Sequence, residues 1–410
     1  MKKIIAFVLT ALLCLQFAAC VKIQDPEPEP QPESAQISNN GGRYVSYGGD
    51  VYYWENWAAC IDHTAIWGDF PEVPGIRRSL ARNNESLFID KGCGNIWIFN
   101  ERFYFTYLDD DYTPHIVSAA MEKSEDGEAI DRRELGVGEI FALDEARGLF
   151  IITDLWEDGL LALDAATGER DYLTGYAQPL LYDAHGGKLY YRFFAFNEAE
   201  EVVLLRCVDV ATGEERDVAW IEPADFEELE YAQYVEVGGV RLDGDRLYLH
   251  MAAYAGTGYH YNGSAFLYID LAGDAVLINE SPTESDWFGV NQPFSSKDGP
   301  FENFAGDYFG WYMCPGEGEA PEVVLSEAEI DRLGLPNGPF FGEEGFVDIR
   351  DVEYSGGALY FSIVRGPRNP DEDIGWREAY DFDTMHVYRK DLAAGTIDEL
   401  YSFDKDGMRG

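Results

Sequence analysis

The stretch Gly186-Gly187-Lys188-Leu189-Tyr190-Tyr191 joins a glycine turn to a run of large apolar side chains. This combination is typical of the turn between two antiparallel strands, because glycine adopts the positive φ that a tight hairpin requires. Related stretches recur at intervals of roughly 40 to 60 residues, which is near the period of propeller repeats. The seven copies begin at Gly48, Asn100, Arg147, Gly186, Gly244, Gly306 and Gly356.

Most copies are followed by a second apparent hairpin with its own turn, clearest at residues 160–173, 203–218, 266–278 and 387–400. Strand, turn, strand, loop, strand, turn, strand is one four-stranded blade. The sequence therefore predicts an all-β, seven-bladed β-propeller, or six or eight blades if one edge is misread. The predicted blades span residues 42–91, 93–136, 138–175, 177–223, 233–282, 300–340 and 345–405, and residues 326–335 of the sixth favour a short helix.

The repeats also resemble known ones. The turn LxxxDxxTGE at residues 160–169, with a second copy at 205–214, resembles the repeats of quinoprotein-like propellers. The GGxLYY strands resemble the TolB-type propeller repeats of bacterial periplasmic and surface lipoproteins. The resemblance runs from Gly42 to the C-terminus and implies a fold without an activity. The vicinal cysteines and the cofactor-binding tryptophan arrangement of true quinoprotein dehydrogenases are absent from the sequence.

The first residues predict an export signal. Lys2 and Lys3 precede an apolar run at residues 4–17, and Ala18 and Ala19 precede Cys20. This ending resembles a bacterial lipobox, which implies that Cys20 carries the lipid; ordinary signal cleavage after an Ala-x-Ala-like site is the alternative. We expect a lipoprotein signal at 1–19, a lipidated and disordered Pro/Glu-rich tether at 20–41 and the propeller at 42–410, anchored by the lipid alone outside the cytoplasm of a bacterial cell.

Charge excludes one class of partner. The 410 residues contain 30 Lys plus Arg against 76 Asp plus Glu, a net charge of −46. Such a chain repels phosphate backbones, so we expect no nucleic-acid partner. With 46% hydrophobic residues the chain still has ample material for a large core.

Long connections predict a recognition face. In a propeller the loops between second and third strands share a face with the connections between blades, and the repeated glycine turns lie on the other face. The long connections are residues 56–75, 253–264, 283–300 and 366–384. Loops on a rigid scaffold often carry recognition. The predicted binding residues are Trp57, Trp67, Tyr259, His260, Tyr261, Trp287, Asn291, Trp376 and Tyr380. The alternative is that these tryptophans only pack their own loops.

Two further sites follow from residue type. Cys60 and Cys93 fall at neighbouring blades on this face, which suggests either a disulfide or two buried thiols, whereas Cys207 lies in an apolar run and is predicted to be core. Asp109, Asp110 and Asp111 present clustered oxygen ligands, so calcium is the one cofactor that the sequence leaves open. A solvated acidic surface is the simpler interpretation.

No linear catalytic motif is present: the six histidines are dispersed, and there is no nucleophile elbow, phosphate loop or zinc signature. The sequence therefore favours a non-catalytic cell-envelope propeller that binds a protein or a glycan, or serves as a scaffold, through its loop face. A propeller hydrolase or lyase acting on extracellular carbohydrate is the alternative, because propellers can assemble sites from distant residues.

Overall fold

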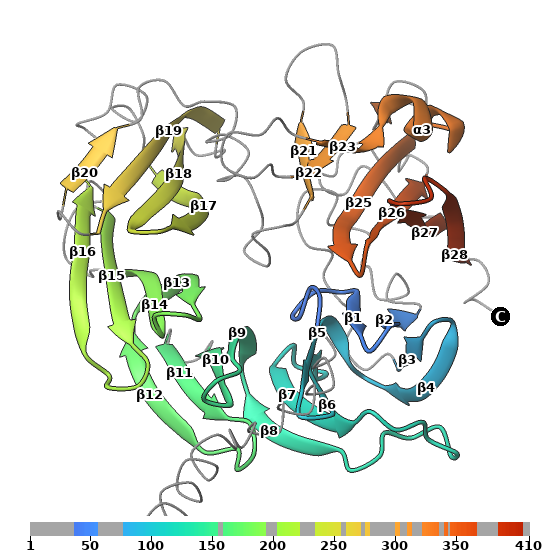
Figure 1. Ribbon diagram of the computed structural model, residues 1–410, viewed down its shortest axis with the longest axis horizontal. Coiled ribbons are helices and arrows are strands. Elements are labelled where there is room, and N and C mark those ends of the chain that lie inside the picture. Colours follow the sequence, from blue (N-terminus) through green and yellow to red (C-terminus); the bar gives the residue numbers. More distant parts are fainter. Residues whose placement is uncertain are drawn as a thin grey trace, which may run out of the picture. The chain divides into compact units, whose positions relative to one another are not determined.

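The strands form antiparallel sheets that follow one another in chain order (Figure 1). The computed structural model describes residues 37–55, 77–154, 159–193, 203–221, 234–255, 260–271, 275–278, 300–303, 310–313, 322–335, 340–342, 345–366 and 384–404. Within these ranges there are seven sheets, each built from consecutive strands of the chain. This arrangement is a β-propeller, as the repeat predicts.

The first four sheets each have four strands. They are β1 (Val45–Tyr47), β2 (Asp50–Glu55), β3 (Arg78–Arg82) and β4 (Glu85–Asp90); β5 (Cys93–Phe99), β6 (Arg102–Leu108), β7 (Pro114–Ala120) and β8 (Arg133–Val137); β9 (Glu139–Asp144), β10 (Leu149–Asp154), β11 (Gly159–Asp164) and β12 (Arg170–Gly175); and β13 (Ala177–Asp183), β14 (Lys188–Phe193), β15 (Val203–Asp209) and β16 (Glu215–Ile221).

The remaining three sheets have four, three and five described strands. They are β17 (Tyr234–Asp243), β18 (Arg246–Ala255), β19 (His260–Asp270) and β20 (Ala275–Ile278); β21 (Pro300–Asn303), β22 (Gly310–Met313) and β23 (Glu322–Ser326); and β24 (Phe340–Gly342), β25 (Gly345–Ser355), β26 (Ala358–Gly366), β27 (Thr384–Asp391) and β28 (Ile397–Asp404).

These sheets agree with the predicted blades except at one edge. The helix expected at residues 326–335 is present as α3 (Glu327–Arg332), with a Ser326–Glu329 capping box at its start. Residue 340 was assigned to the sixth blade, and this is wrong: β24 pairs with β25 and so begins the seventh sheet. The sequence gives no signal for this, because Phe340 and Phe341 suit either edge.

In several sheets the repeated turns are explained by hydrogen bonds between two hairpins of the sheet. The amide that follows the third strand donates to the turn between the first two strands, as in Ala165 N to Gly148 O at 3.0 Å and Val210 N to Gly187 O at 3.0 Å. The last sheet repeats the bond from Leu392 N to Gly357 O at 3.2 Å. The glycine turn and the second turn therefore stabilise one another, which is why the sequence repeats them together.

An aspartate organises the second turn in the same way in three sheets. The Oδ1 atom of Asp164 accepts hydrogen bonds from the amides of Ala166 and Thr167, and equivalent bonds reach Asp209 and Asp391. These backbone bonds lower the pKa of all three carboxyl groups. The repeated Asp in this motif thus folds the hairpin through a side-chain turn.

The outer strands share an irregularity that the repeat does not reveal. In five sheets the last strand carries a bulge at one apolar residue, which pairs with no partner while its neighbours do: Leu87, Leu135, Leu173, Val218 and Leu400. These side chains pack against the core clusters. A bulge increases strand twist and makes the exposed edge a poor template for pairing with another chain.

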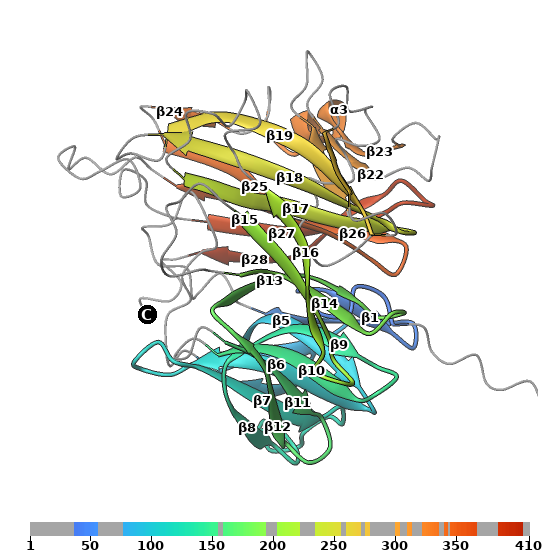
Figure 2. The same ribbon diagram turned by 90° about the vertical axis from the view of Figure 1, so that its left-hand side faces the viewer.

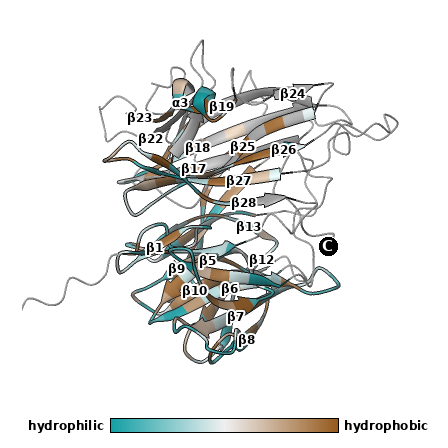
Figure 3. Cartoon of the chain, turned by 90° about the vertical axis from the view of Figure 1, so that its right-hand side faces the viewer, coloured by the Kyte–Doolittle hydropathy of each residue, from teal (hydrophilic) through white to brown (hydrophobic). Residues whose placement is uncertain are grey.

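Many strand residues are apolar, and residues at the tips of several turns are hydrophilic (Figure 3). Buried apolar side chains of neighbouring sheets form shared core clusters. The last sheet also packs on the first through one shared cluster, in which the ring of Tyr360 stacks on that of Tyr44 at 4.6 Å. Glu353 of β25 accepts hydrogen bonds from Asn39 Nδ2 and from the amides of Arg43 and Tyr44. Among the described residues, the first and last sheets share no strand. Side-chain contacts therefore hold these two sheets together.

Candidate functional site

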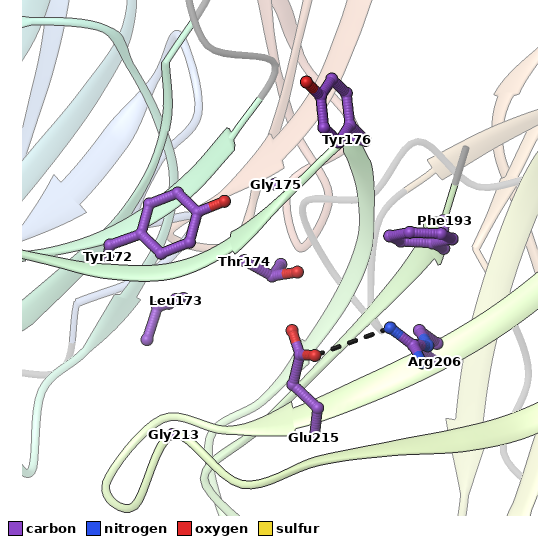
Figure 4. A pocket seen from close by; sticks show the side chains of 9 residues that line it. All are labelled: Tyr172, Leu173, Thr174, Gly175, Tyr176, Phe193, Arg206, Gly213 and Glu215. Atoms are coloured by element: carbon purple, nitrogen blue, oxygen red, sulfur yellow. Dashed lines mark ion pairs between the residues drawn. The ribbon is translucent and has the colours of Figure 1, made fainter. Parts of the chain in front are cut away.

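The third sheet (β9–β12) and the fourth (β13–β16) are neighbours (Figure 2). A groove lies between them on the side of their later strands (Figure 4). It is shallow and largely open to solvent, with a volume of about 560 Å³. Residues from both sheets line it: Tyr172, Leu173, Thr174, Gly175, Tyr176, Phe193, Arg206, Gly213 and Glu215. The groove thus combines aromatic rings with one cation and one carboxylate.

One wall is formed by β12 and the residue that follows it. Tyr172 is 61% exposed and Tyr176 is 46% exposed, although both rings are large and mostly apolar. The hydroxyl of Tyr172 lies against Gly175, where an added Cβ would overlap it. A glycine at this position therefore leaves room for the phenol ring beside the strand.

The opposite wall centres on Arg206 of β15. Its guanidinium lies over the ring of Phe193, 4.8 Å from the centroid, and its Nε atom donates to Asp217 Oδ1 at 2.7 Å. A second ion pair reaches Glu215 Oε2 at 3.6 Å, and Figure 4 shows it facing the groove. Two carboxylates and a ring thus fix the orientation of Arg206.

Tyr191 supports this wall from below. Its ring is fully buried and its hydroxyl donates to Glu215 Oε1 at 3.0 Å. Burial raises the pKa of Tyr191 to about 12, and the bond to the Glu215 carboxylate adds to the rise. The tyrosine therefore stays protonated at neutral pH and holds Glu215 in place.

A third exposed ring continues the same surface. Trp220 pairs with Leu204, and Leu204 pairs with Phe193 on its other side. Directly opposite residues of antiparallel strands lie on one face, so Trp220 belongs to the face that carries Phe193. Trp220 is 55% exposed. Three of the six large hydrophobic residues that are exposed in the described ranges thus belong to these two sheets.

The lining residues of the groove combine aromatic rings with oriented polar groups. The carboxylate of Glu215 is engaged by Tyr191 and by Arg206. Aromatic rings beside oriented polar groups are suited to holding a ligand with both apolar and hydroxylated surfaces.

The predicted calcium ligands lie in a tight loop between β6 and β7. Asp109 Oδ1 accepts hydrogen bonds from the amides of Asp111 and Thr113, both at 2.9 Å, and Asp109 Oδ2 lies 3.0 Å from His115 Nε2. The backbone bond from Thr113 and then the contact with His115 lower the pKa of Asp109. In the described part of the chain no group of three or more potential metal ligands is arranged around one point. The calcium site remains a prediction, while Asp109 has a clear role in shaping the loop.

His115 joins this loop to the outer strand of its sheet. Its Nδ1 atom lies 2.8 Å from Glu134 Oε1, and its ring stacks on that of Tyr107 with centroids 4.9 Å apart. The guanidinium of Arg132 lies over the other side of this pair, 5.3 Å from the Tyr107 centroid, and binds Asp90 at 2.8 Å. Every polar group of this cluster thus has a partner, which marks it as a structural network.

Most of the other predicted site residues lie outside the described ranges: Cys20, Trp57, Cys60, Trp67, Tyr259, Trp287, Asn291, Trp376 and Tyr380. His260 and Tyr261 were expected in a loop, and this is wrong, because they begin β19 and pair with Ala255 and Tyr254. Cys93, expected in a connection, is the first residue of β5. Cys207 is buried and unpaired, which confirms its assignment to the core.

The groove was missed by sequence reasoning. Tyr172, Phe193 and Arg206 stand in ordinary alternating strand patterns, which do not distinguish an open boundary between sheets from a filled one. The one available signal was Tyr172 and Tyr176 flanking Gly175 at the end of an outer strand.

Comparison with solved structures finds propellers at low similarity. The β-propeller domain of the Trilobed protease from Pyrococcus furiosus is 10% identical with a TM-score of 0.44, over 90% of this chain and 98% of that one. An acylaminoacyl peptidase matches at 10% identity and a TM-score of 0.44, over 92% of this chain and 54% of that one. TolB from Acinetobacter baumannii matches at 11% identity and a TM-score of 0.33, over 73% of this chain and 65% of that one.

These likenesses are too weak to transfer any activity, so the fold assignment rests on the sheets themselves. No protein-family model matches the chain, and no curated protein is similar to it at a significant level. Among the described residues no helix is long and apolar enough to cross a membrane.

Proposed function

We propose that this chain is a cell-envelope lipoprotein whose propeller binds a protein or a glycan without catalysing a reaction. Cys20 would carry the lipid and residues 20–41 would form the tether, as the lipobox-like ending and the Pro/Glu-rich segment suggest. The predicted loop residues and the groove would then be presented outside the cytoplasm.

The observation that carries this proposal is the groove between the third and fourth sheets. It leaves large rings exposed, whereas the boundary between the last sheet and the first buries its rings. Its polar groups Arg206 and Glu215 are oriented by Tyr191, Phe193 and Asp217. Exposed aromatic surface on a rigid scaffold is typical of recognition.

A carbohydrate hydrolase or lyase is the second candidate. Carboxylates near the groove support it, because glycoside cleavage uses two of them. The two nearest carboxylates, Glu215 and Asp217, are however both paired with Arg206, and each would have to leave that ion pair before it could act on a substrate.

Co-purification from the native envelope tests the proposal. We expect full-length lipidated protein to retain a protein or glycan, identified by mass spectrometry and sugar analysis, and to release no new reducing ends during incubation. Accumulation of reducing or unsaturated ends would favour the enzyme. Labelling with a fatty-acid analogue, compared between wild type and Cys20→Ser, tests the anchor: a label that survives the substitution contradicts lipidation at Cys20.

A further inference from the structure

We infer that the groove between the third and fourth sheets binds an uncharged oligosaccharide, with one sugar ring lying on Tyr172 and hydroxyl groups bonding to Glu215 and Arg206. This inference rests on the proposed function and deepens it, because it names the ligand class. It also places recognition at a boundary between two sheets, apart from the loops that the sequence favours.

Exposed aromatic rings form a platform at the groove. Tyr172 stands on an outer strand with most of its ring exposed, and the hydroxyl rests against Gly175. Tyr176 follows one residue after the strand, and Trp220 extends the facing surface. Exposed flat rings at this density provide apolar contact area at a low entropic cost, since each ring has only two side-chain torsions. The C–H faces of a pyranose ring match such a platform.

The charges at the groove favour a neutral ligand. Arg206 is the one cation among the residues lining the groove, and Asp217 and Glu215 both pair with it. An anionic ligand would find no unpaired cation there and would approach a chain of net charge −46. A cationic ligand would have to displace Arg206 from two carboxylates. The remaining lone pairs and N–H groups nevertheless suit the donors and acceptors of neutral hydroxyl groups.

An extended peptide is the main competing occupant. A peptide that adds to a sheet edge needs a regular row of backbone groups. The edge of β12 is interrupted at Leu173, which is bulged between Tyr172 and Thr174. The outer strand β16 is interrupted at Val218 in the same way. Neither edge bordering the groove therefore offers the regular ladder that strand addition requires.

Isothermal titration calorimetry on the full-length protein in a zwitterionic, sugar-free detergent tests the inference. The probes are cellotetraose, xylotetraose, mannotetraose and chitotetraose, with tetragalacturonate and tetralysine as the charged comparisons. We expect at least one neutral probe to bind and both charged probes to fail. Tyr172→Ala and Gly175→Ala should each weaken that binding about 10-fold or more, a difference of about 1.4 kcal/mol.

Tyr112→Ala is the matched control, because Tyr112 is an equally exposed tyrosine that lies in another sheet's loop, at 62% exposure. It should leave the affinity unchanged. Gly175→Ala keeps the phenol of Tyr172 but displaces it. A loss of affinity in this variant therefore shows that the position of the ring matters and not only its presence. The melting temperatures of Tyr172→Ala and Tyr112→Ala confirm that both variants are folded.

Three results would overturn the inference: no neutral probe binds, binding survives Tyr172→Ala, or tetralysine binds in a Tyr172-dependent manner. Envelope co-purification separates this failure from failure of the proposed function. If the wild-type protein still retains a partner while no neutral probe binds, the groove assignment alone fails. If nothing is retained either, both fail.

Discussion

The boundary between the last sheet and the first differs from the boundary between the third and fourth sheets in how its outer part is filled. At the first of these, Tyr44, Tyr53 and Tyr360 are all buried, and Tyr53 stacks on Tyr401 of the outermost strand. At the second, the inner strands are packed while Tyr172 and Tyr176 near the outer strands remain exposed. Tyrosine side chains therefore pack the last sheet against the first at one boundary and line a groove at the other.

The polar contacts at these two boundaries also differ. Glu353 joins the last sheet to the segment before β1 by accepting three hydrogen bonds across the boundary. Between the third and fourth sheets, Tyr182 donates to the buried carboxylate of Asp144, but this contact lies on the inner strands β9 and β13. Further out, the polar groups Arg206, Glu215 and Asp217 all belong to one sheet. Across the outer part of this boundary, the hydroxyl of Thr174 in β12 hydrogen-bonds with that of the buried Tyr191 in β14.

The largest effect is expected from Tyr360→Ala. Removing this buried ring leaves a cavity beside Tyr44, and truncation of large buried aromatics costs about 3–5 kcal/mol of unfolding free energy. Tyr360→Phe retains the stacked ring and should keep most of the stability. Denaturant unfolding of both variants checks this. Equal stabilities of the two variants would contradict the claim that the Tyr360 ring holds the last sheet against the first.

A smaller loss is expected from Glu353→Ala, because the amides of Arg43 and Tyr44 would lose their charged acceptor. Hydrogen bonds to charged groups contribute about 1.5–3 kcal/mol, so we expect a loss of about 3 kcal/mol for the set. Hydrogen exchange should quicken at these two amides before the amides of β14 are affected. If hydrogen exchange quickened equally in all sheets, the contact of Glu353 with the segment before β1 would not be a link that can open separately from the rest of the fold.

Asp144→Asn tests the inner link between the third and fourth sheets. Burial alone would raise the pKa of Asp144, but hydrogen bonds from Tyr182 and Arg147 outweigh it and lower the pKa. A lowered folded-state pKa adds stability above the unfolded value near ~3.8, and this stability is lost as pH falls through the folded pKa. We expect the variant to lose about 2 kcal/mol at pH 7.

The difference between Asp144→Asn and wild type should narrow as pH falls below about 4, because protonation removes the wild-type advantage. Unfolding curves between pH 7 and pH 3 measure this. A difference that stays constant with pH would show that the charge of Asp144 contributes nothing to the link.

The smallest effect on stability is expected from Tyr172→Ala. An exposed side chain away from the core usually changes stability by no more than about 0.5 kcal/mol. Thermal unfolding beside wild type measures it. A loss comparable with that of Tyr360→Ala would show that the Tyr172 ring is structural and that the two boundaries do not differ in kind.

The repeat predicted the sheets because each glycine turn and each Asp turn acts locally: Gly148 and Asp164 shape hairpins within one sheet. The helix after Ser326 was also readable, since its capping box is local. The bulges were not readable, because Leu173 resembles any apolar strand residue in sequence, and its lack of a partner is decided by the twist of the sheet. The assignment of β24 depended on pairing with a later strand.

The groove was harder to predict for a related reason. Tyr172 and Tyr360 are both tyrosines in strand patterns, and only the packing of neighbouring sheets decides that one is exposed and the other buried. Arg206 likewise gains its two carboxylate partners from strand pairing and not from spacing along the chain.

The most direct test of the account measures stability and oligosaccharide affinity together for Tyr360→Ala and Tyr172→Ala, using whichever neutral tetrasaccharide binds the wild type. The account predicts opposite profiles: Tyr360→Ala lowers the unfolding free energy by about 3–5 kcal/mol and, below its melting temperature, retains the affinity, whereas Tyr172→Ala keeps the stability and loses affinity about 10-fold. Parallel losses of stability and affinity in both variants would contradict it.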